Sequence, residues 1–235
     1  MREMTDPGTV GTQYARVERL ETRRSVWGPG PEGVSPVEVL RTLVVATGAR
    51  RVLEIGCGTG QFARSVLDEA PGTDYLATDL SPAMVEATRA LGVRAEVAAA
   101  DELPFGDGSF DGAVAAWMLY HVPDLDGTLA ELRRVLRDGG TLHVATNGRE
   151  HLAGLLRDAG GEALVTQFSS ENAAEALGRH FEHVVQRDVE TRATFPDHTA
   201  ACAYLATFTP DLAQALPPFD GPRTYAGHTA VLTAH

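Results

Sequence analysis

The chain has 235 residues, a length that indicates one domain with at most a small additional segment. Its 32 acidic and 20 basic residues give a net charge of −12, and because such a surface repels polyphosphate we expect no nucleic-acid partner. The two cysteines, Cys57 and Cys202, are too few for a disulfide scaffold or a four-thiolate zinc site, and no metal centre is expected. No apolar run approaches the ~20 residues of a membrane helix, and residues 1–20 lack the apolar core of a signal peptide. We therefore expect a reduced, cytoplasmic protein that does not enter the membrane.

Residues 1–50 are expected to form a helical leader. A capping box, Ser35-Pro36-Val37-Glu38, predicts the start of a helix that runs to about Thr47. The stretch 27–33 is rich in glycine and proline and lies next to aromatic residues. It indicates either a mobile flap over a binding site or a simple surface linker.

Strand and helix patterns then alternate between residues 51 and 146. Short apolar runs predict strands, and apolar residues at three- and four-residue spacing predict helices. The expected strands are 51–55, 73–80, 93–100, 108–119 and 141–146, and the expected helices are 61–69, 81–91 and 125–140. Ser81 is expected to cap the second of these helices, with Pro82 at its first position. This alternation predicts a parallel, doubly wound α/β sheet with helices on both faces.

The remainder of the chain is less regular. We expect helices over 169–178 and 198–208, strands over 181–195 and 227–234, and an irregular connection with four prolines over 209–224. Residues 51–235 are therefore expected to form one domain.

A glycine-rich loop follows the first strand, in Glu54-Ile55-Gly56-Cys57-Gly58-Thr59-Gly60. Glycines let the chain turn sharply and let a ligand lie against the backbone, at the edge where open parallel sheets bind ligands. Taken alone, the loop is equally well explained as a tight turn without a ligand. Asp79 ends the second strand, 19 residues after Gly60, and adds a carboxylate suited to a ribose diol.

Two features distinguish a nucleoside site from a dinucleotide site. The glycines are spaced GxGxG rather than GxGxxG, so the third comes one residue early for a pyrophosphate loop. Glu54 stands two residues before the first glycine, where a carboxylate would repel pyrophosphate but can pair with an ammonium group. The loop therefore favours a zwitterionic ligand, and a nicotinamide-dependent dehydrogenase is the less favoured alternative.

From Arg51 to Asn147 the sequence resembles the class I S-adenosylmethionine-dependent methyltransferases, in particular their small-molecule, ubiquinone-biosynthesis-like branch. Five segments in the family's order carry the resemblance: LEIGCGTG (53–60), DLSPAM (79–84), DELPF (101–105), FD (110–111) through MLYHV (118–122), and LRDGG (136–140). The last has Arg-Asp where the family commonly has Lys-Pro. The resemblance implies a sheet of seven strands, the last antiparallel.

The resemblance also implies which residues bind S-adenosylmethionine. They are Glu54, Gly56, Cys57, Gly58, Gly60, Asp79, Leu80, Met84, Asp101, Glu102, Leu103 and Ala116. The three glycines would pack against the methionine part, with Glu54 near its amino group, and Asp79 would hold the ribose hydroxyls. Ala116 would contact the methionine backbone, at a position where the family often has a polar residue.

Adenine would lie between Leu80 and Met84, and Asp101 would accept from its amino group, helped by the backbone of Glu102 or Leu103. Structural roles stay open for several of these residues: Asp79 and Asp101 as turn or cap carboxylates, and Met84 as helix core. Asp111 is expected to be structural, because it precedes the edge where the ligand binds.

His121, just beyond the fourth strand, is the candidate general base, with Tyr120 beside it. Methyl transfer from a sulfonium is an in-line displacement that needs mainly proximity and alignment, and a base is required only when the acceptor must lose a proton. An imidazole with an ordinary pKa of about 6.5 suits that role. Alternatively, both residues anchor the loop or line the pocket. His143 is expected to be buried structure, and no supporting constellation surrounds His151, His180, His183, His198, His228 or His235.

The expected function is methyl transfer to a small-molecule acceptor. The leader, with Tyr14, Arg16 and Trp27, and the segment after the fifth strand are expected to form the acceptor pocket, the leader closing as a lid. A nucleic-acid methyltransferase and a non-catalytic S-adenosylmethionine-binding module are the alternatives.

Overall fold

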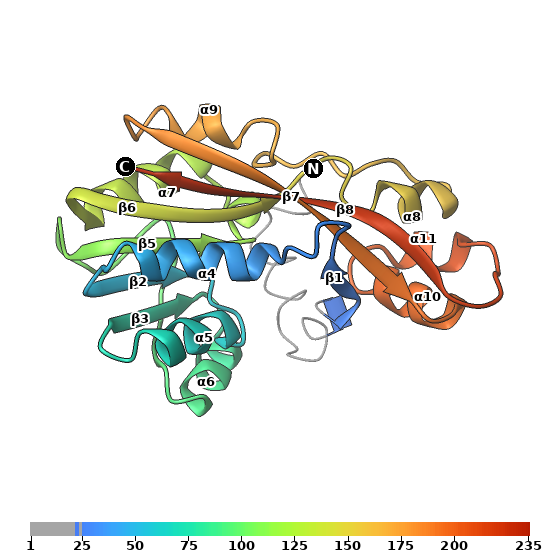
Figure 1. Cartoon of the computed structure of the whole chain (residues 1–235), viewed down its shortest axis with the longest axis horizontal. Coiled ribbons are helices and arrows are strands. Elements are labelled where there is room, and N and C mark those ends of the chain that lie inside the picture. The colour runs from blue at the N-terminus through green and yellow to red at the C-terminus, as the bar shows by residue number, and fades with distance from the viewer. Residues whose placement is uncertain (1–21, 24) are drawn as a thin grey trace.

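An eight-stranded sheet forms the centre of the fold in the computed structural model, which describes residues 22, 23 and 25–235 (Figure 1). The strand order is β1-β7-β8-β6-β5-β2-β3-β4. The strands are β1 (Trp27–Pro29), β2 (Arg51–Ile55), β3 (Asp74–Asp79), β4 (Arg94–Val97), β5 (Phe110–Ala116), β6 (Leu136–Asn147), β7 (Val184–Phe195) and β8 (Arg223–Ala234). Strands β2 to β6 pair in parallel, whereas β8 is antiparallel to both β6 and β7. The predicted α/β sheet with an antiparallel last strand is confirmed.

The additional strand, β1, comes from the glycine- and proline-rich stretch of the leader. It pairs antiparallel with β7, Trp27 opposite Ala193. Gly30 then donates its N–H to the carbonyl of Glu190 at 3.1 Å. A Cβ at Gly30 would lie 2.3 Å from that carbonyl oxygen, so this close approach requires glycine. Three residues are too few to show a strand's alternation, which is why the sequence did not predict β1.

Helices cover both faces of the sheet. They are α4 (Pro36–Ala46), α5 (Gln61–Glu69) and α6 (Pro82–Ala90) on one face, and α7 (Leu125–Val135) and α9 (Ala173–Leu177) on the other. Figure 1 shows α4, α5 and α6 on the near side, with α7 and α9 beyond the sheet. Each group packs its buried side chains into a separate apolar cluster against the strands. The expected covering of both faces is therefore confirmed.

A third apolar cluster lies where β7 and β8 extend past the end of β6. The helices α8 (Ala153–Asp158), α10 (His198–Ala206) and α11 (Pro210–Ala215) gather there around the two strands (Figure 1). The expectation of an irregular connection over 209–224 is wrong for its first half, because α11 occupies it. Pro210 is at the first helical position, where a proline costs no intrahelical hydrogen bond.

The helix ends differ from expectation in three places. Ser35 and Ser81 occupy the N-cap positions of α4 and α6, but neither side chain makes a capping hydrogen bond, so the predicted capping box is not formed. The predicted helix 125–140 ends at Val135, because Leu136 is extended and starts β6. Leu136 has the apolar spacing that would extend the helix. In the structure it is buried as the first residue of β6, where it pairs with Phe110 of β5.

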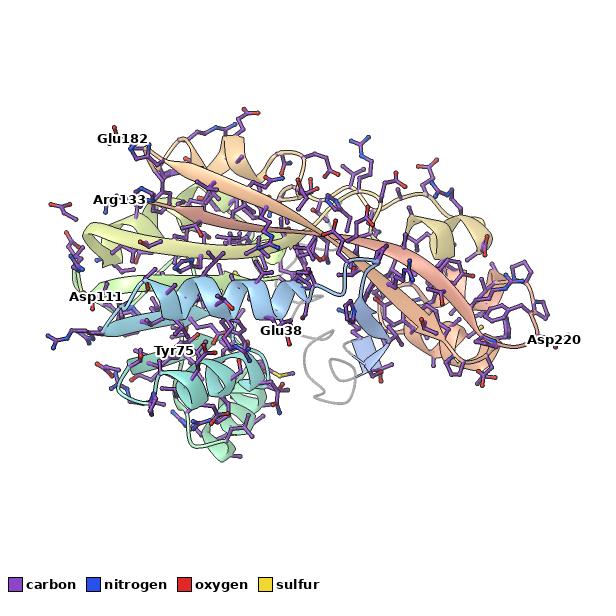
Figure 2. All side chains as sticks on the ribbon, viewed as in Figure 1. Glu38, Tyr75, Asp111, Arg133, Glu182 and Asp220 are labelled. Carbon is purple, nitrogen blue, oxygen red and sulfur yellow. The ribbon has the colours of Figure 1, made fainter. Side chains whose placement is uncertain are left out.

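Asp111 ties together the end of the sheet where the parallel strands begin (Figure 2). Its Oδ2 accepts from the backbone N–H groups of Arg50 and Arg51, both at 2.9 Å, and its Oδ1 accepts from Arg137 Nε at 2.6 Å. Desolvation opposes ionisation of this carboxyl, but these hydrogen bonds outweigh it and lower its pKa. The position agrees with the expected structural role.

Within residues 22–23 and 25–235, no helix is long and apolar enough to cross a membrane.

Leu132 tests the packing of α7 against the sheet. Its side chain is fully buried, so Leu132→Ala should lower the free energy of unfolding by about 2–5 kcal/mol in urea denaturation. Val185→Ala is the control: Val185 is 64% exposed, and its truncation should change stability by less than about 0.5 kcal/mol. Equal losses in the two variants would contradict this account of the core.

Candidate active site

The glycine loop joins β2 to α5 at the carboxyl edge of the parallel strands. Gly56, Gly58 and Gly60 all have left-handed backbone, with φ of 64°, 56° and 75°. A Cβ at Gly56 would lie 2.8 Å from Met118, and one at Gly60 would lie 2.7 Å from Thr88. The glycines therefore do two things: they turn the chain, and they let the loop pack closely against α6 and the segment after β5.

Asp79 fastens this loop from the end of β3. Its Oδ2 accepts from the N–H of Gly58 and its Oδ1 from the N–H of Ser81, both at 2.9 Å. Burial raises the pKa of Asp79, although the hydrogen bonds from Ser81, Gly58 and Leu80 oppose that shift. Each carboxylate oxygen has further acceptor capacity, so the group can still receive two hydroxyl donors from a diol.

Two buried side chains support the loop from beneath; Cys57 was expected to bind the cofactor, and Thr88 was not identified from the sequence. Thr88 of α6 donates its hydroxyl to the carbonyl of Gly58 at 3.0 Å. The sulfur of Cys57 lies 3.4 Å from the Thr88 hydroxyl, with only 2% of the residue exposed. Burial raises the pKa of the Cys57 thiol, helped by the charge of Glu54, so the thiol stays neutral. Cys57 therefore belongs to the support of the loop, as a chemically inert group.

Glu54 is buried in the strand that leads into the loop. Its Oε2 accepts from the hydroxyl of Tyr75 on the neighbouring strand β3 at 3.0 Å (Figure 2 labels Tyr75). Burial and the adjacent carboxylate raise the pKa of Tyr75, which keeps the phenol a donor. Tyr75 is thus a second residue missed from the sequence, since its strand position predicts only burial. Contact of Glu54 with a cofactor ammonium stays a prediction.

The residues expected around adenine are differently exposed. Leu80 is 55% exposed at the sheet edge, whereas Met84 is fully buried and packs in the core. Met84 therefore presents no exposed surface to a ligand here, which favours a role in the core of the helix packing over contact with adenine. Asp101 and Glu102 are exposed in the turn after β4.

The backbone of that turn is already engaged. Leu103 donates its N–H to Glu131 Oε1 at 2.9 Å, and Glu102 donates its own to the carbonyl of Ala99 at 3.4 Å. Arg134 of α7 donates to the carbonyls of Leu103 and Phe105, and its hydrogen bonds lower the pKa of Glu131. Both backbone N–H groups therefore already have acceptors within the protein, and a contact of adenine with the backbone of Glu102 or Leu103 stays a prediction.

The second half of the site follows β5. Ala116 ends this strand beside the glycine loop, because Ala115 pairs with Ile55 of β2. Tyr120 and His121 lie in a short 3₁₀ turn, η1 (Leu119–His121), with ring centroids 4.4 Å apart in an edge-to-face arrangement. Both side chains are half-buried. The structure therefore brings the candidate base and the cofactor loop to one edge of the sheet.

The remaining histidines are placed away from this edge or held by partners. His143 is buried within β6, its Nδ1 is 3.3 Å from Thr233 Oγ1, and burial lowers its pKa to about 4. That agrees with its expected structural role. His151 does have a partner, which the sequence did not predict. Its ring stacks on that of Trp27 with the centroids 4.1 Å apart, and burial lowers its pKa to about 3. Tyr14 and Arg16 lie outside the described residues.

In the described part of the chain, no group of three or more His, Cys, Asp or Glu side chains could hold a metal ion.

Comparison with known proteins assigns a family to the part of the chain that carries the glycine loop. Residues 53–144 match the family model described as a methyltransferase domain. The chain is similar to a 23S rRNA (guanine(748)-N(1))-methyltransferase of Streptomyces fradiae, at 39% identity over 153 residues that cover 63% of this chain and 51% of that protein. It is also similar to a ubiquinone/menaquinone biosynthesis C-methyltransferase of a Geobacter species, at 35% identity over 104 residues that cover 40% of this chain and 44% of that protein.

A solved structure shares the fold across most of the chain. A putative methyltransferase from Bacillus halodurans superposes with a TM-score of 0.64 at 17% identity, covering 86% of this chain and 98% of that one. The chain spans about half the length of the curated relatives it matches.

Asp79 provides a direct test of the site. Asp79→Ala should weaken S-adenosylhomocysteine binding by about 1.5–3 kcal/mol, the scale of hydrogen bonds to a charged group, as measured by isothermal titration calorimetry. Asp74→Ala, at the other end of β3, is the matched control and should bind as the unmodified protein does. A cofactor affinity unchanged in Asp79→Ala would remove this residue from the site.

The raised pKa of Asp79 predicts a pH dependence of the same affinity. The ionised carboxylate would accept the two ribose hydroxyls. Because its pKa is raised, Asp79 becomes protonated at a higher pH than an ordinary aspartate does. Affinity for S-adenosylhomocysteine should therefore fall as the pH is lowered through that raised pKa, and Asp79→Asn should lose most of this dependence. An identical pH profile in the two proteins would contradict the assignment.

Proposed function

We propose that this chain, in which residues 53–144 form a class I S-adenosylmethionine-dependent methyltransferase domain, transfers the cofactor's methyl group to a small-molecule acceptor. The observation that carries the proposal is the left-handed glycine loop fastened to Asp79, at the same edge as Tyr120 and His121.

The residues present fit this cofactor. Asp79 offers two fixed oxygens for the ribose hydroxyls, and the exposed Leu80 beside it offers apolar surface for adenine. The carboxylates of Asp79, which accepts from the loop, and of Glu54, in the strand before it, favour a ligand that carries a positive charge. When bound, S-adenosylmethionine supplies a methyl group on a sulfonium, an electrophile that is already activated.

The protein's contribution is therefore mainly geometric. The loop backbone and Asp79 fix the cofactor, and the residues after β5 hold the acceptor in line with the methyl group. If the acceptor is a hydroxyl, it must lose a proton, and His121 is the side chain at this edge suited to take it. Tyr120, packed edge-on against His121, would orient its imidazole.

The leader belongs to the acceptor side in this proposal. Trp27 in β1 pairs with β7 and stacks on His151, in the part of the fold that follows β6. Arg23 donates to the hydroxyl and the carbonyl of Thr207 at 2.9 and 2.8 Å. These contacts hold the described part of the leader against the segment after β6, and α4 packs into the core of the sheet. Closure of residues 1–50 as a lid over a domain of residues 51–235 stays a prediction.

Charge favours a small acceptor over a nucleic acid. The segment 148–235, which follows the last parallel strand, contains six arginines and eleven aspartates and glutamates, a net charge of −5. Binding to RNA depends on neutralising phosphates with cationic side chains, and this segment offers the opposite balance.

RNA methylation is the second candidate function. The similarity to the Streptomyces fradiae protein, whose name specifies 23S rRNA, is the observation that favours it. A binding module without turnover is the third.

Methyl-labelled S-adenosylmethionine distinguishes these candidates. Incubation of the protein with cell extract should place label in low-mass, RNase-resistant products extracted into organic solvent. Label in RNase-sensitive material would favour the second candidate and contradict a small acceptor. Bound S-adenosylhomocysteine without any transferred label, over a range of acceptors, would contradict the enzyme and favour the module.

His121 tests the chemistry of the acceptor. If it removes a proton from an oxygen acceptor, His121→Ala should lower kcat by ~10²-fold or more, with a pH–rate profile that loses its acidic limb. Tyr120→Phe should lower kcat less, because it keeps the ring that packs on the imidazole. A loss below tenfold in His121→Ala would remove the base from the mechanism and leave proximity alone to account for the rate.

A further inference from the structure

The backbone turns abruptly one residue after β5. Trp117 has a φ of 55°, and in the part of the chain that the structure describes it and Leu152 are the two non-glycine residues with positive φ. A left-handed backbone crowds the Cβ of a bulky side chain, so it persists only where surrounding contacts hold it. Such residues concentrate at functional sites, and Trp117 lies at the carboxyl edge beside the glycine loop.

Two hydrogen bonds hold Trp117 in this conformation. Its backbone N–H donates to the carbonyl of Ala145 at 2.7 Å, and its indole Nε1–H donates to Asn147 Oδ1 at 3.1 Å. The same oxygen of Asn147 also accepts from the Thr229 hydroxyl at 3.2 Å. The indole thereby fastens the end of β5 to β6 and, through Asn147, to β8.

The turn at Trp117 decides what lies on either side of it. Before it, Ala116 stands next to the first glycine of the loop. After it, Met118 packs so closely on Gly56 that a Cβ there would lie 2.8 Å from the Met118 side chain. Met118 then accepts the N–H of His121 at 2.9 Å, which starts the turn that carries the candidate base.

We infer that Trp117 is a positioning residue for methyl transfer, and the inference rests on the function proposed above. Its left-handed backbone, locked by the indole–Asn147 hydrogen bond, aligns the Gly56 loop with the Tyr120–His121 turn. Trp117 acts through Met118 on one side and His121 on the other. It sets the distance and angle between donor and acceptor while leaving the affinity for the cofactor to Asp79 and the loop.

Removing the hydrogen bond from either partner tests this role. Trp117→Phe keeps an aromatic ring but has no Nε1–H, and Asn147→Ala removes the acceptor. Because small misplacements in a reacting pair are costly, each variant should lower kcat at least ~10-fold, with S-adenosylhomocysteine affinity within ~3-fold of the unmodified protein. The double variant should lose no more than the single ones, since all three lack the same bond.

Thr233→Val is the matched control. It removes the 3.3 Å contact with His143, which precedes Asn147 in β6, and should leave kcat unchanged even if the melting temperature falls. Turnover of Trp117→Phe within twofold of the unmodified protein, or losses that add in the double variant, would overturn the inference. An inactive unmodified protein would instead overturn the proposed function.

A readout that does not depend on turnover completes the test. The chain has four methionines, so the methyl-¹³C methionine spectrum is simple and Met118→Leu assigns the signal of interest. On addition of S-adenosylhomocysteine, the Met118 methyl signal should shift in the unmodified protein. In Trp117→Phe the shift should be altered at saturation. The same bound-state shift in both proteins would show that the indole does not position this segment.

Discussion

The carboxylate of Asp79 holds the site together. It receives one backbone N–H from the glycine loop and one from the start of α6, so it joins two segments that are 23 residues apart in the chain, Gly58 and Ser81. Without an acceptor at that point, two amide groups at the sheet edge would lose their partners, and the left-handed loop would lose its brace. Burying the carboxylate is costly, as its raised pKa records, and its two hydrogen bonds offset part of that cost.

The same residue connects structure to chemistry. A carboxylate already oriented by two amide donors needs little reorganisation to receive a diol, so in the proposed function the residue that holds the loop would also bind the ribose. On the other side of the loop, Gly56 admits Met118, and Met118 leads to the turn of His121. In the function proposed above, the glycine loop would therefore contact both the cofactor, through Asp79, and the turn that carries the candidate base, through Met118.

Much of this arrangement was predictable from the sequence, for a physical reason. Parallel strands buried on both faces need continuous apolar runs, and the helices between them need one apolar face, so residues 51–146 showed their alternation clearly. Asp79 and the glycines were found because their roles depend on chain position. The supports Tyr75, Thr88 and Arg134 were not found, because each acts on residues distant in the sequence. Strand β1 was not predicted because three residues are too few to show alternation. The positive φ of Trp117 was not predicted because the residue type does not indicate it.

A crystal structure of the protein with S-adenosylhomocysteine tests the central claim most directly. The account predicts both ribose hydroxyls within hydrogen-bond distance of the Asp79 carboxylate, which keeps its bonds to Gly58 and Ser81, and the homocysteine part against Gly56. Ribose bound elsewhere, or a loop that has released Asp79 to admit the ligand, would contradict it.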